Sequence, residues 1–204
     1  DFETGDLTGW TMQANGMAKG WQINDGTFDP DGPHGVEPPI GGSFDVVSTQ
    51  LGSGVNLISE LITIPPVVSQ ATIQWQDRIF NYHQNFADPD QEFRVNILDA
   101  SMNLITTVFS TDPGDPNSQP GPNMRSFDLN SVLPTIVGVP VYLQFVEEAQ
   151  NYFFNVFLDN IHFDVQDCPD NIVVDNDPGE CGAVVEYPLY ASGWVLVTQI
   201  DESG

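Results

Sequence analysis

The sequence predicts an all-β protein built as a β-sandwich. Apolar residues show almost no helical periodicity along the chain. Sixteen prolines and eighteen glycines separate short runs rich in Val, Ile, Thr, Phe and Tyr, a pattern typical of short strands joined by turns. Apolar residues make up 40% of the chain, enough for a real core, so global disorder is not expected.

Five segments predict strands clearly: 71–77, 92–98, 104–110, 139–146 and 153–165. In the second of these, EFRVNIL, apolar and polar residues alternate, so we expect the apolar side chains of Phe93, Val95 and Ile97 to face the core. The acidic, basic and amide side chains between them then face outward. The third segment is the expected hairpin partner of the second, across a turn at 99–103.

Two long segments predict loops, 27–42 and 111–123, because each holds several Pro and Gly turns. Loops of that length in a compact domain are usually functional, or are held in place by something such as a metal.

Charge excludes several kinds of partner. Twenty-nine acidic side chains against four basic ones give a formal net charge of -25. Nucleic acids and anionic membranes are bound by Lys/Arg surfaces, so neither is expected, and no apolar run is long enough for direct membrane insertion. Divalent-cation binding, adaptation to salt and plain solubility are the three explanations of the acidity.

Motifs for catalysis are absent. The sequence holds no nucleophile elbow, metalloprotease helix or phosphate loop, so we do not expect an enzyme. The histidines His34, His83 and His162 show no mutual ligand spacing. The aromatic residues can stack on sugar rings, but most are expected in the core of a sandwich of this size.

Residues 1–165 resemble the jelly-roll modules of the MAM and choice-of-anchor type, found in secreted and surface proteins. The resemblance lies in DFETGDLTGW, GPHG followed by GG, ISELITIP, QEFRVNILDASMNLITTVFST, RSFDLNSVLP, GVPVYLQFVEE and FLDNIHFDV, in that order. It implies a jelly-roll β-sandwich located outside the cell or on its surface. The cysteines usual in animal MAM domains are missing, which favours a microbial protein.

Residues 168–204 resemble the beginning of a hyalin repeat, an immunoglobulin-like adhesion module, through CPDNIVVDNDPGECGAVVEYP. We therefore predict a jelly-roll domain at 1–166 and a partial Ig-like β segment at 167–204. Half a sandwich has open sheet edges and cannot be stable alone. In a secreted chain Cys168 and Cys181 suggest a disulfide, most simply with each other, although in a complete repeat either can pair with the missing half.

Acidic residues near both ends of the first domain predict a metal site. The opening stretch holds Asp1, Glu3 and Asp6 with no lysine or arginine nearby. In FLDNIHF at 157–163, inward-pointing Phe157, Ile161 and Phe163 would place Asp159 on their face. An inward carboxylate is costly unless it is paired or bound to a cation, and arginine is scarce in this chain.

The resembled jelly rolls place their first and last strands side by side, which implies that Glu3 and Asp159 meet. Calcium prefers carboxylate and carbonyl oxygens, and the segment 41–45 can supply carbonyls. We predict a structural calcium site formed by Glu3 and Asp159, with Asp6, Asp1 and Asp45 as helpers. Solvated acids at a chain end are the alternative, mainly for Asp1 and Asp6.

Three functions follow from these observations. The first is a non-catalytic extracellular structural or adhesive module, a subunit of a surface or extracellular fibre. Its partners would be neighbouring copies that complete the open sheet of 168–204 by strand addition. The second is a carbohydrate-binding module of a larger secreted enzyme or adhesin, with glycans as partners. A hydrolase is the third and the weakest.

Overall fold

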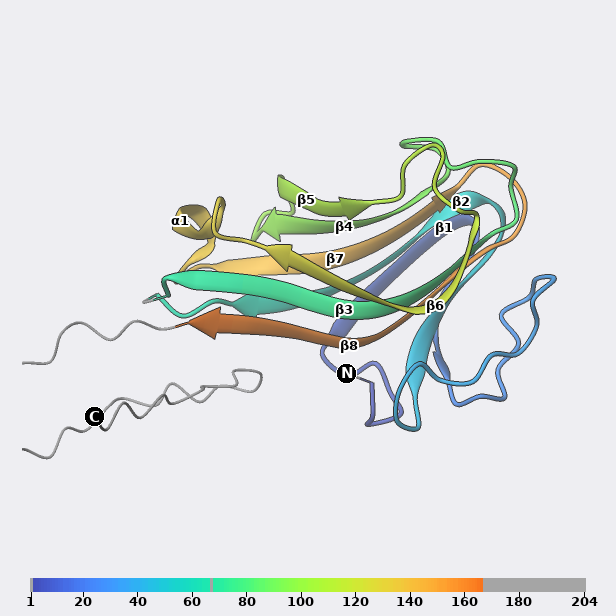
Figure 1. Ribbon diagram of the computed structural model, residues 1–204, viewed down its shortest axis with the longest axis horizontal. Helices are drawn as coiled ribbons and strands as arrows, with labels where there is room; N and C mark the ends of the chain where they lie inside the picture. The colour runs from blue at the N-terminus through green and yellow to red at the C-terminus, as the bar shows by residue number, and fades with distance from the viewer. Residues whose placement is uncertain (1, 67, 167–204) are drawn as a thin grey trace, which may run out of the picture.

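The computed structural model describes residues 2–66 and 68–166, which form eight strands and one short helix (Figure 1). Their bounds are β1 Trp10–Asn24, β2 Asp45–Thr63, β3 Gln70–Asn81, β4 Glu92–Asp99, β5 Leu104–Ser110, β6 Ser118–Asp128, α1 Leu133–Ile136, β7 Pro140–Ala149 and β8 Phe154–Gln166. The predicted all-β jelly-roll sandwich is confirmed for this part of the chain. The partial Ig-like segment at 167–204 lies outside the described residues.

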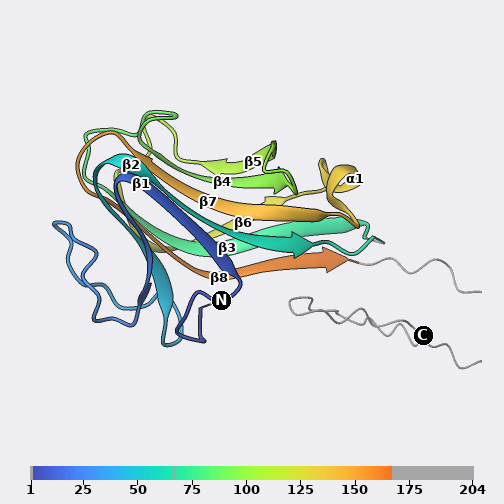
Figure 2. The same ribbon diagram turned by 180° about the vertical axis from the view of Figure 1, so that it is seen from behind.

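The strands form two layers that share one long hairpin. In the first, the β4 layer, β5, β4 and β7 pair in that order; in the second, the β3 layer, β8, β3 and β6 do so. Strand β2 belongs to both, because its residues 54–63 pair with β7 whereas Val46, Val47 and Gln50 pair with β8. Strand β1 runs antiparallel along β2, so the hairpin joins the layers along one side (Figures 1 and 2).

Glycines allow this hairpin to change layers. The β1–β2 register shifts after Gly16 and again after Ala18. A side chain on Gly54 would clash with the carbonyl oxygen of Asn15, and one on Gly16 would clash with that of Ser53. The two backbones therefore approach so closely at the bend that only glycine fits.

Large aromatic rings fill the space between the layers. Trp75 of β3 is fully buried, stacked on Phe127 with 5.5 Å between ring centroids, and meets Phe145 of β7 edge-on at 5.8 Å. The predicted inward residues of β4, Phe93, Val95 and Ile97, are buried in the same core. The alternation in EFRVNIL is thus confirmed, as is its hairpin with β5.

Three strands were not predicted, β1, β2 and β6. The predicted loop at 111–123 is wrong in its second half, because β6 begins at Ser118 and pairs with β3 despite two prolines. β6 is the last strand in the order of the sheet, where proline is tolerated.

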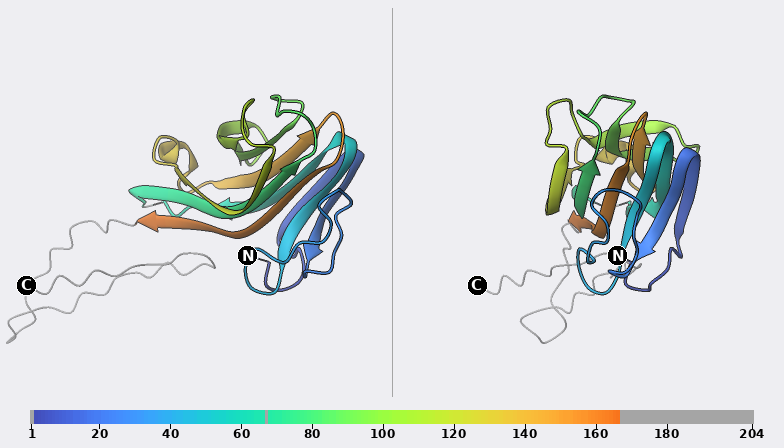
Figure 3. Two further views of the ribbon diagram at one scale, coloured as in Figure 1. Left: turned by 45° about the vertical axis from the view of Figure 1, so that its right-hand side comes forward. Right: turned by 90° about the vertical axis from the view of Figure 1, so that its right-hand side faces the viewer.

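The predicted loop at 27–42 is confirmed, and it lies against one end of the β3 layer, near the bend of β2 (Figure 3). Phe28 and Ile40 from the loop pack against Val47, Phe80 and Phe157, forming a second apolar cluster outside the main core. No helix among the described residues is long and apolar enough to cross a membrane.

Candidate functional site

The Glu3 carboxylate lies against the backbone that leads into β2. Its oxygens accept the backbone N–H of Ser43 at 3.1 and 3.0 Å and that of Phe44 at 3.4 Å. A side chain on Gly42, whose φ is +54°, would occupy the position of this carboxylate. Glycine at this position is therefore required both by the backbone conformation and by the carboxylate.

Asp159 of β8 lies beside the neighbouring glycine. It is only 1% exposed, its Oδ2 lies where a side chain on Gly41 would come within 3.2 Å, and its Oδ1 has no hydrogen-bond partner. Burial raises the pKa of Asp159, and the negative charge of Glu3 raises it further. A buried carboxylate oxygen without a partner is unusual in a native protein.

Asp45 adds a third carboxylate to this region. It accepts the side-chain amide of Asn24 at 2.7 Å and the backbone N–H of Ile40 at 2.8 Å. Burial raises the pKa of Asp45 to about 7, with a further contribution from the charge of Asp159. The structure thus brings Glu3, Asp45 and Asp159 to the segment at 40–45, and we refer to them as the acidic cluster.

Glu3 and Asp159 come together, but not through neighbouring first and last strands as predicted. Residues 2–9 form turns, and the first strand pairs with β2 and not with the last strand. Asp159 shares the outer face with Phe157, whereas Ile161 and Phe163 face the core. The β3–β8 register shifts here, and Asn160 adopts a positive φ of 52°, so one extra residue switches the faces of β8.

The remaining predicted ligands lie elsewhere. Asp6 is exposed and accepts the hydroxyl of Thr4 at 3.1 Å and the N–H of Thr8 at 3.0 Å, bonds that lower its pKa. Asp1, Cys168 and Cys181 lie outside the described residues. Within residues 2–66 and 68–166, no group of three or more His, Cys, Asp or Glu side chains is arranged to hold a metal ion.

A row of uncharged polar side chains crosses the outer face of the β4 layer. Its members are directly opposite one another on five neighbouring strands, in the order Thr11, Ser59, Gln144, Asn96 and Thr107. We call them the polar row. Four strand spacings of about 4.8 Å give it a length of roughly 19 Å.

Part of the hydrogen-bonding capacity of the polar row is unused. The Thr107 hydroxyl donates to Asn96 Oδ1 at 2.8 Å, and Asn96 Nδ2 donates to Gln144 Oε1 at 3.4 Å. Among the described residues, Gln144 Nε2 and the hydroxyls of Ser59 and Thr11 have no hydrogen-bond partner. Ser59 is only 5% exposed and Gln144 8%, whereas Thr11 is exposed, so these unused donors and acceptors lie at or just below the surface of this face.

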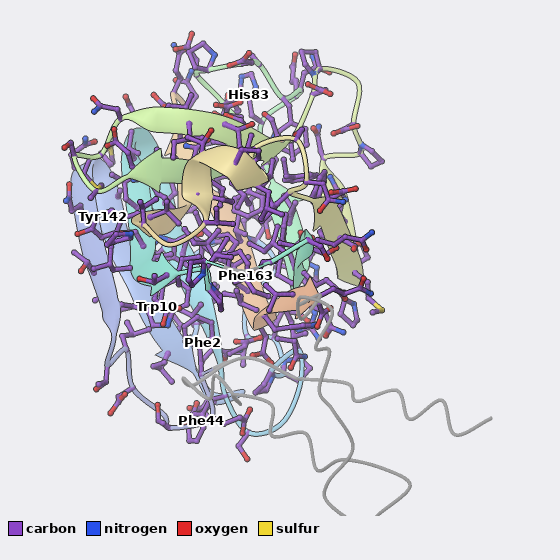
Figure 4. All side chains as sticks on the ribbon, turned by 90° about the vertical axis from the view of Figure 1, so that its left-hand side faces the viewer. Phe2, Trp10, Phe44, His83, Tyr142 and Phe163 are labelled. Carbon is purple, nitrogen blue, oxygen red and sulfur yellow. The ribbon has the colours of Figure 1, made fainter. Side chains whose placement is uncertain are left out.

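An apolar row runs beside the polar row on the same face. It consists of Leu61, Tyr142, Leu98 and Leu104, again directly opposite one another. Leu61 is 52% exposed and Leu104 60%, and the half-buried ring of Tyr142 lies between them in register (labelled in Figure 4). Leu98 is only 4% exposed, so the apolar row is open to solvent mainly at Leu61 and Leu104, and exposed apolar side chains that lie together can mark an interaction site.

Charged residues border the polar row on its other side. Arg94 of β4 pairs with Glu92 on its own strand and with Glu148 of β7, the latter at 2.9 Å. Glu92 also accepts the hydroxyl of Ser110 at 2.7 Å. One guanidinium therefore pairs with both carboxylates and leaves one net negative charge among the three groups.

A pocket of about 250 Å³ opens between the two layers near the end of β8. We call it the seam pocket. Trp10 of β1, Glu60 and Ile62 of β2, and Ile161 and Phe163 of β8 form its walls (Trp10 and Phe163 in Figure 4). Residues 4–8 and His162 supply its rim: Thr4, Asp6, Thr8 and His162.

Most aromatic residues are structural, as expected. Trp21 and Trp75 are buried. Among residues 2–66 and 68–166, the exceptions include Tyr142 on the outer face, Trp10 and Phe163 in the seam pocket, and Tyr152, which is 62% exposed. Alternation alone indicated that the outward residues of β4 are polar, but the polar row needed β1 and β2, which the sequence did not reveal.

Comparisons with known proteins place the fold. No protein-family model and no curated protein matches the sequence. Among solved structures, the carbohydrate-binding module TmCBM61 in complex with β-1,4-galactotriose superposes with a TM-score of 0.50 at 10% identity, covering 79% of this chain and 92% of that one.

Two further structures superpose equally well. One describes carbohydrate-binding modules of the β-sandwich superfamily, with a TM-score of 0.50, 18% identity, and 80% and 60% of the two chains covered. The other is the K3 cleaved adhesin domain of Lys-gingipain from Porphyromonas gingivalis W83, with a TM-score of 0.50, 16% identity, and 79% and 94% covered. At these identities the likeness establishes the β-sandwich fold.

Proposed function

We propose that this chain is a non-catalytic carbohydrate-binding module of an extracellular or cell-surface protein, and that it binds a neutral glycan across the outer face of the β4 layer. The polar row carries this proposal. Sugar hydroxyls need donors and acceptors side by side, and the unpartnered groups of Gln144, Ser59 and Thr11 supply both. The β-sandwich folds of TmCBM61 and the gingipain adhesin domain support it.

The apolar row complements the polar row for this ligand. A pyranose ring has apolar C–H faces and polar edges, so a chain lying across the strands can place rings against Tyr142 and hydroxyls against Gln144. The net charge of -25 opposes acidic polysaccharides. A neutral oligosaccharide of several units matches the roughly 19 Å length of the row.

The same face supports a binding role in preference to catalysis. Glycoside hydrolysis needs two carboxyl groups that are free to exchange protons or attack. Glu92 and Glu148, the carboxylates nearest the polar row, are both held by Arg94, and Glu92 is almost fully buried.

Glycan-array screening followed by calorimetry tests the proposal. We expect a neutral oligosaccharide to bind, and Gln144→Ala and Tyr142→Ala to weaken binding by roughly tenfold or more each, since about 1.4 kcal/mol corresponds to a factor of ten. Met124→Ala is the control, because Met124 is exposed on β6 in the other layer. Folded variants of Gln144 and Tyr142 that bind as tightly as the parent would refute the proposal.

We also propose that calcium binds at the acidic cluster and stabilises the fold. The unpartnered Oδ1 of Asp159 and the nearby charge of Glu3 suit a cation, and calcium accepts carbonyl oxygens as well as carboxylates. Asp159 and Glu3 would hold the ion, with Asp45 beside them. Asp6 is taken up by its own turn and does not reach this cluster.

The fibre hypothesis depends on strands at 168–204, outside the described residues, and stays a prediction. So do the resemblances to MAM and hyalin-repeat modules and the disulfide between Cys168 and Cys181. Among the described residues, the features of the outer face favour glycan binding over fibre assembly.

A further inference from the structure

The seam pocket has a lining that core packing does not explain. Along β2, Ile58, Glu60 and Ile62 alternate toward the space between the layers. The middle position of this series is apolar in a simple sandwich, because a carboxylate loses hydration there. Glu60 has no hydrogen-bond or ion-pair partner among the described residues, and burial raises its pKa.

The opposite walls are flat and apolar. Trp10 is directly across from Glu60 in the β1–β2 register, and its ring is held by Phe2 at 5.4 Å and Phe145 at 6.2 Å between centroids. Phe163 approaches from β8 (Figure 4). The indole N–H of Trp10 has no partner among the described residues. A fixed indole with a free N–H suits stacking on a ring that carries hydroxyls.

The charge of the lining is negative. Asp6 at the rim accepts the hydroxyl of Thr4 and the N–H of Thr8 through Oδ1. The rim imidazole of His162 is exposed, with Nδ1 3.0 Å from the carbonyl of Asn160 and Nε2 3.7 Å from Asp164. No lysine or arginine lines the pocket. Burial raises the pKa of Glu60 and the N-terminal amino group lowers it, so this carboxylate already responds to a positive charge, and a cationic ligand would pair with it in the same way.

We propose that the seam pocket binds one pyranose ring of an amino sugar with its amine protonated. The ammonium lies between Glu60 and Asp6, the ring face stacks on Trp10, and the hydroxyls meet Thr4 and Thr8. The pocket volume of about 250 Å³ is below the range that holds drug-sized ligands, so a single ring is the appropriate size. Cation–π attraction from the indole adds to the charge pairing.

This site is separate from the outer face of the β4 layer, and it does not depend on glycan binding there. Trp10 and Glu60 face the space between the layers, whereas the polar row lies on the opposite face of the β4 layer. Variants in the two places therefore test the two proposals independently.

Calorimetric titration with short oligomers of glucosamine, and with the same oligomers fully N-acetylated, tests the inference on the full chain. We expect the free-amine oligomer to bind at least tenfold more tightly than the acetylated one. Glu60→Gln, which keeps the shape of the side chain, should reduce that binding at least tenfold. Asp90→Asn, at an exposed acid in the β3–β4 loop, and Met124→Ala, on β6 away from the pocket, should leave it unchanged.

Several outcomes would overturn the proposal. Equal binding of amine and acetylated oligomers would show that the amine is not recognised. Equal binding of free lysine would show a site for any ammonium, without a role for the sugar ring. If Asp90→Asn reduced binding of the glucosamine oligomers as much as Glu60→Gln, their binding would reflect non-specific attraction to the acidic surface. No binding of the glucosamine oligomers would also overturn it.

Discussion

Two buried carboxylates, those of Asp77 and Glu147, differ in whether a positively charged side chain pairs with them. Asp77 faces the core and is paired with Arg125 at 2.9 Å and with the indole N–H of Trp75 at 3.0 Å. Glu147 of β7 has no such partner. It is fully buried, Asn56 donates to its Oε2 at 2.8 Å, and its Oε1 has no hydrogen-bond partner.

Glu147 predicts a pH dependence of stability. Burial raises the pKa of Glu147 from 4.5 to about 8, so between these values the folded protein keeps a proton that the unfolded chain has lost. Stability must then fall as the pH rises from about 4.5 to about 8, and level off above. Urea unfolding of Glu147→Gln across pH 5 to 9 should show a shallower fall than the parent, because glutamine does not titrate.

Asp45, with its pKa raised to about 7, also lowers the stability over this pH range. In Glu147→Gln the fall of stability with pH should therefore be shallower than in the parent without disappearing. Asp90→Asn, at an exposed position, serves as the control and should keep the slope of the parent. If Glu147→Gln and the parent lost stability at the same rate, Glu147 would be charged in the folded state.

The strands that the sequence predicted are those that obey simple rules. β4 alternates cleanly and β5 follows after a short turn, so both were placed almost to the residue. β1 and β2 carry several glycines, and β6 carries Pro120 and Pro122, residues that argue against a strand. The glycines are required by the bend between layers, which no local pattern indicates.

How much of each site could be predicted depended on the same strands. The acidic cluster was anticipated because carboxylates near both ends of the domain are visible in the sequence. The polar row and the seam pocket depend on the β1–β2 register, so they could not be predicted from the sequence without that hairpin.

The bend in the hairpin gives a matched pair of substitutions. Gly54→Ala should destabilise the fold by roughly 1–3 kcal/mol, because the new methyl group would meet the backbone oxygen of Asn15. Gly52→Ala should cost much less, since its methyl group would meet only the flexible side chain of Met17, with the sulfur at 2.9 Å as the nearest atom. Thermal unfolding of both variants measures the difference, and equal losses would rule out backbone crowding as the cause.

Charge is the dominant property of the whole molecule. All four basic side chains are paired: Lys19 with Asp31, Arg78 with Glu37, Arg94 with Glu92 and Glu148, and Arg125 with Asp77. Most of the 29 acids therefore have no basic partner, and their mutual repulsion opposes the compact state. Any cation relieves this repulsion by screening, so a specific calcium site has to be distinguished from a general effect of salt.

Calcium at the acidic cluster predicts a stabilisation that screening cannot reproduce. A ligand that binds only the folded state stabilises it in proportion to the logarithm of its concentration above the dissociation constant. Millimolar calcium should therefore raise the melting temperature by several degrees more than magnesium at equal ionic strength, because magnesium gives up its water ligands reluctantly. Chelation should reverse the effect.

Asp159→Asn removes the negative charge of a carboxylate whose Oδ1 has no hydrogen-bond partner. This variant should lose the stabilisation that is specific to calcium and keep the general stabilisation by salt. Asp6→Asn, in its separate turn, should respond to calcium like the parent. An equal response of Asp159→Asn and the parent would place the calcium elsewhere, and equal effects of calcium and magnesium would leave screening as the whole explanation.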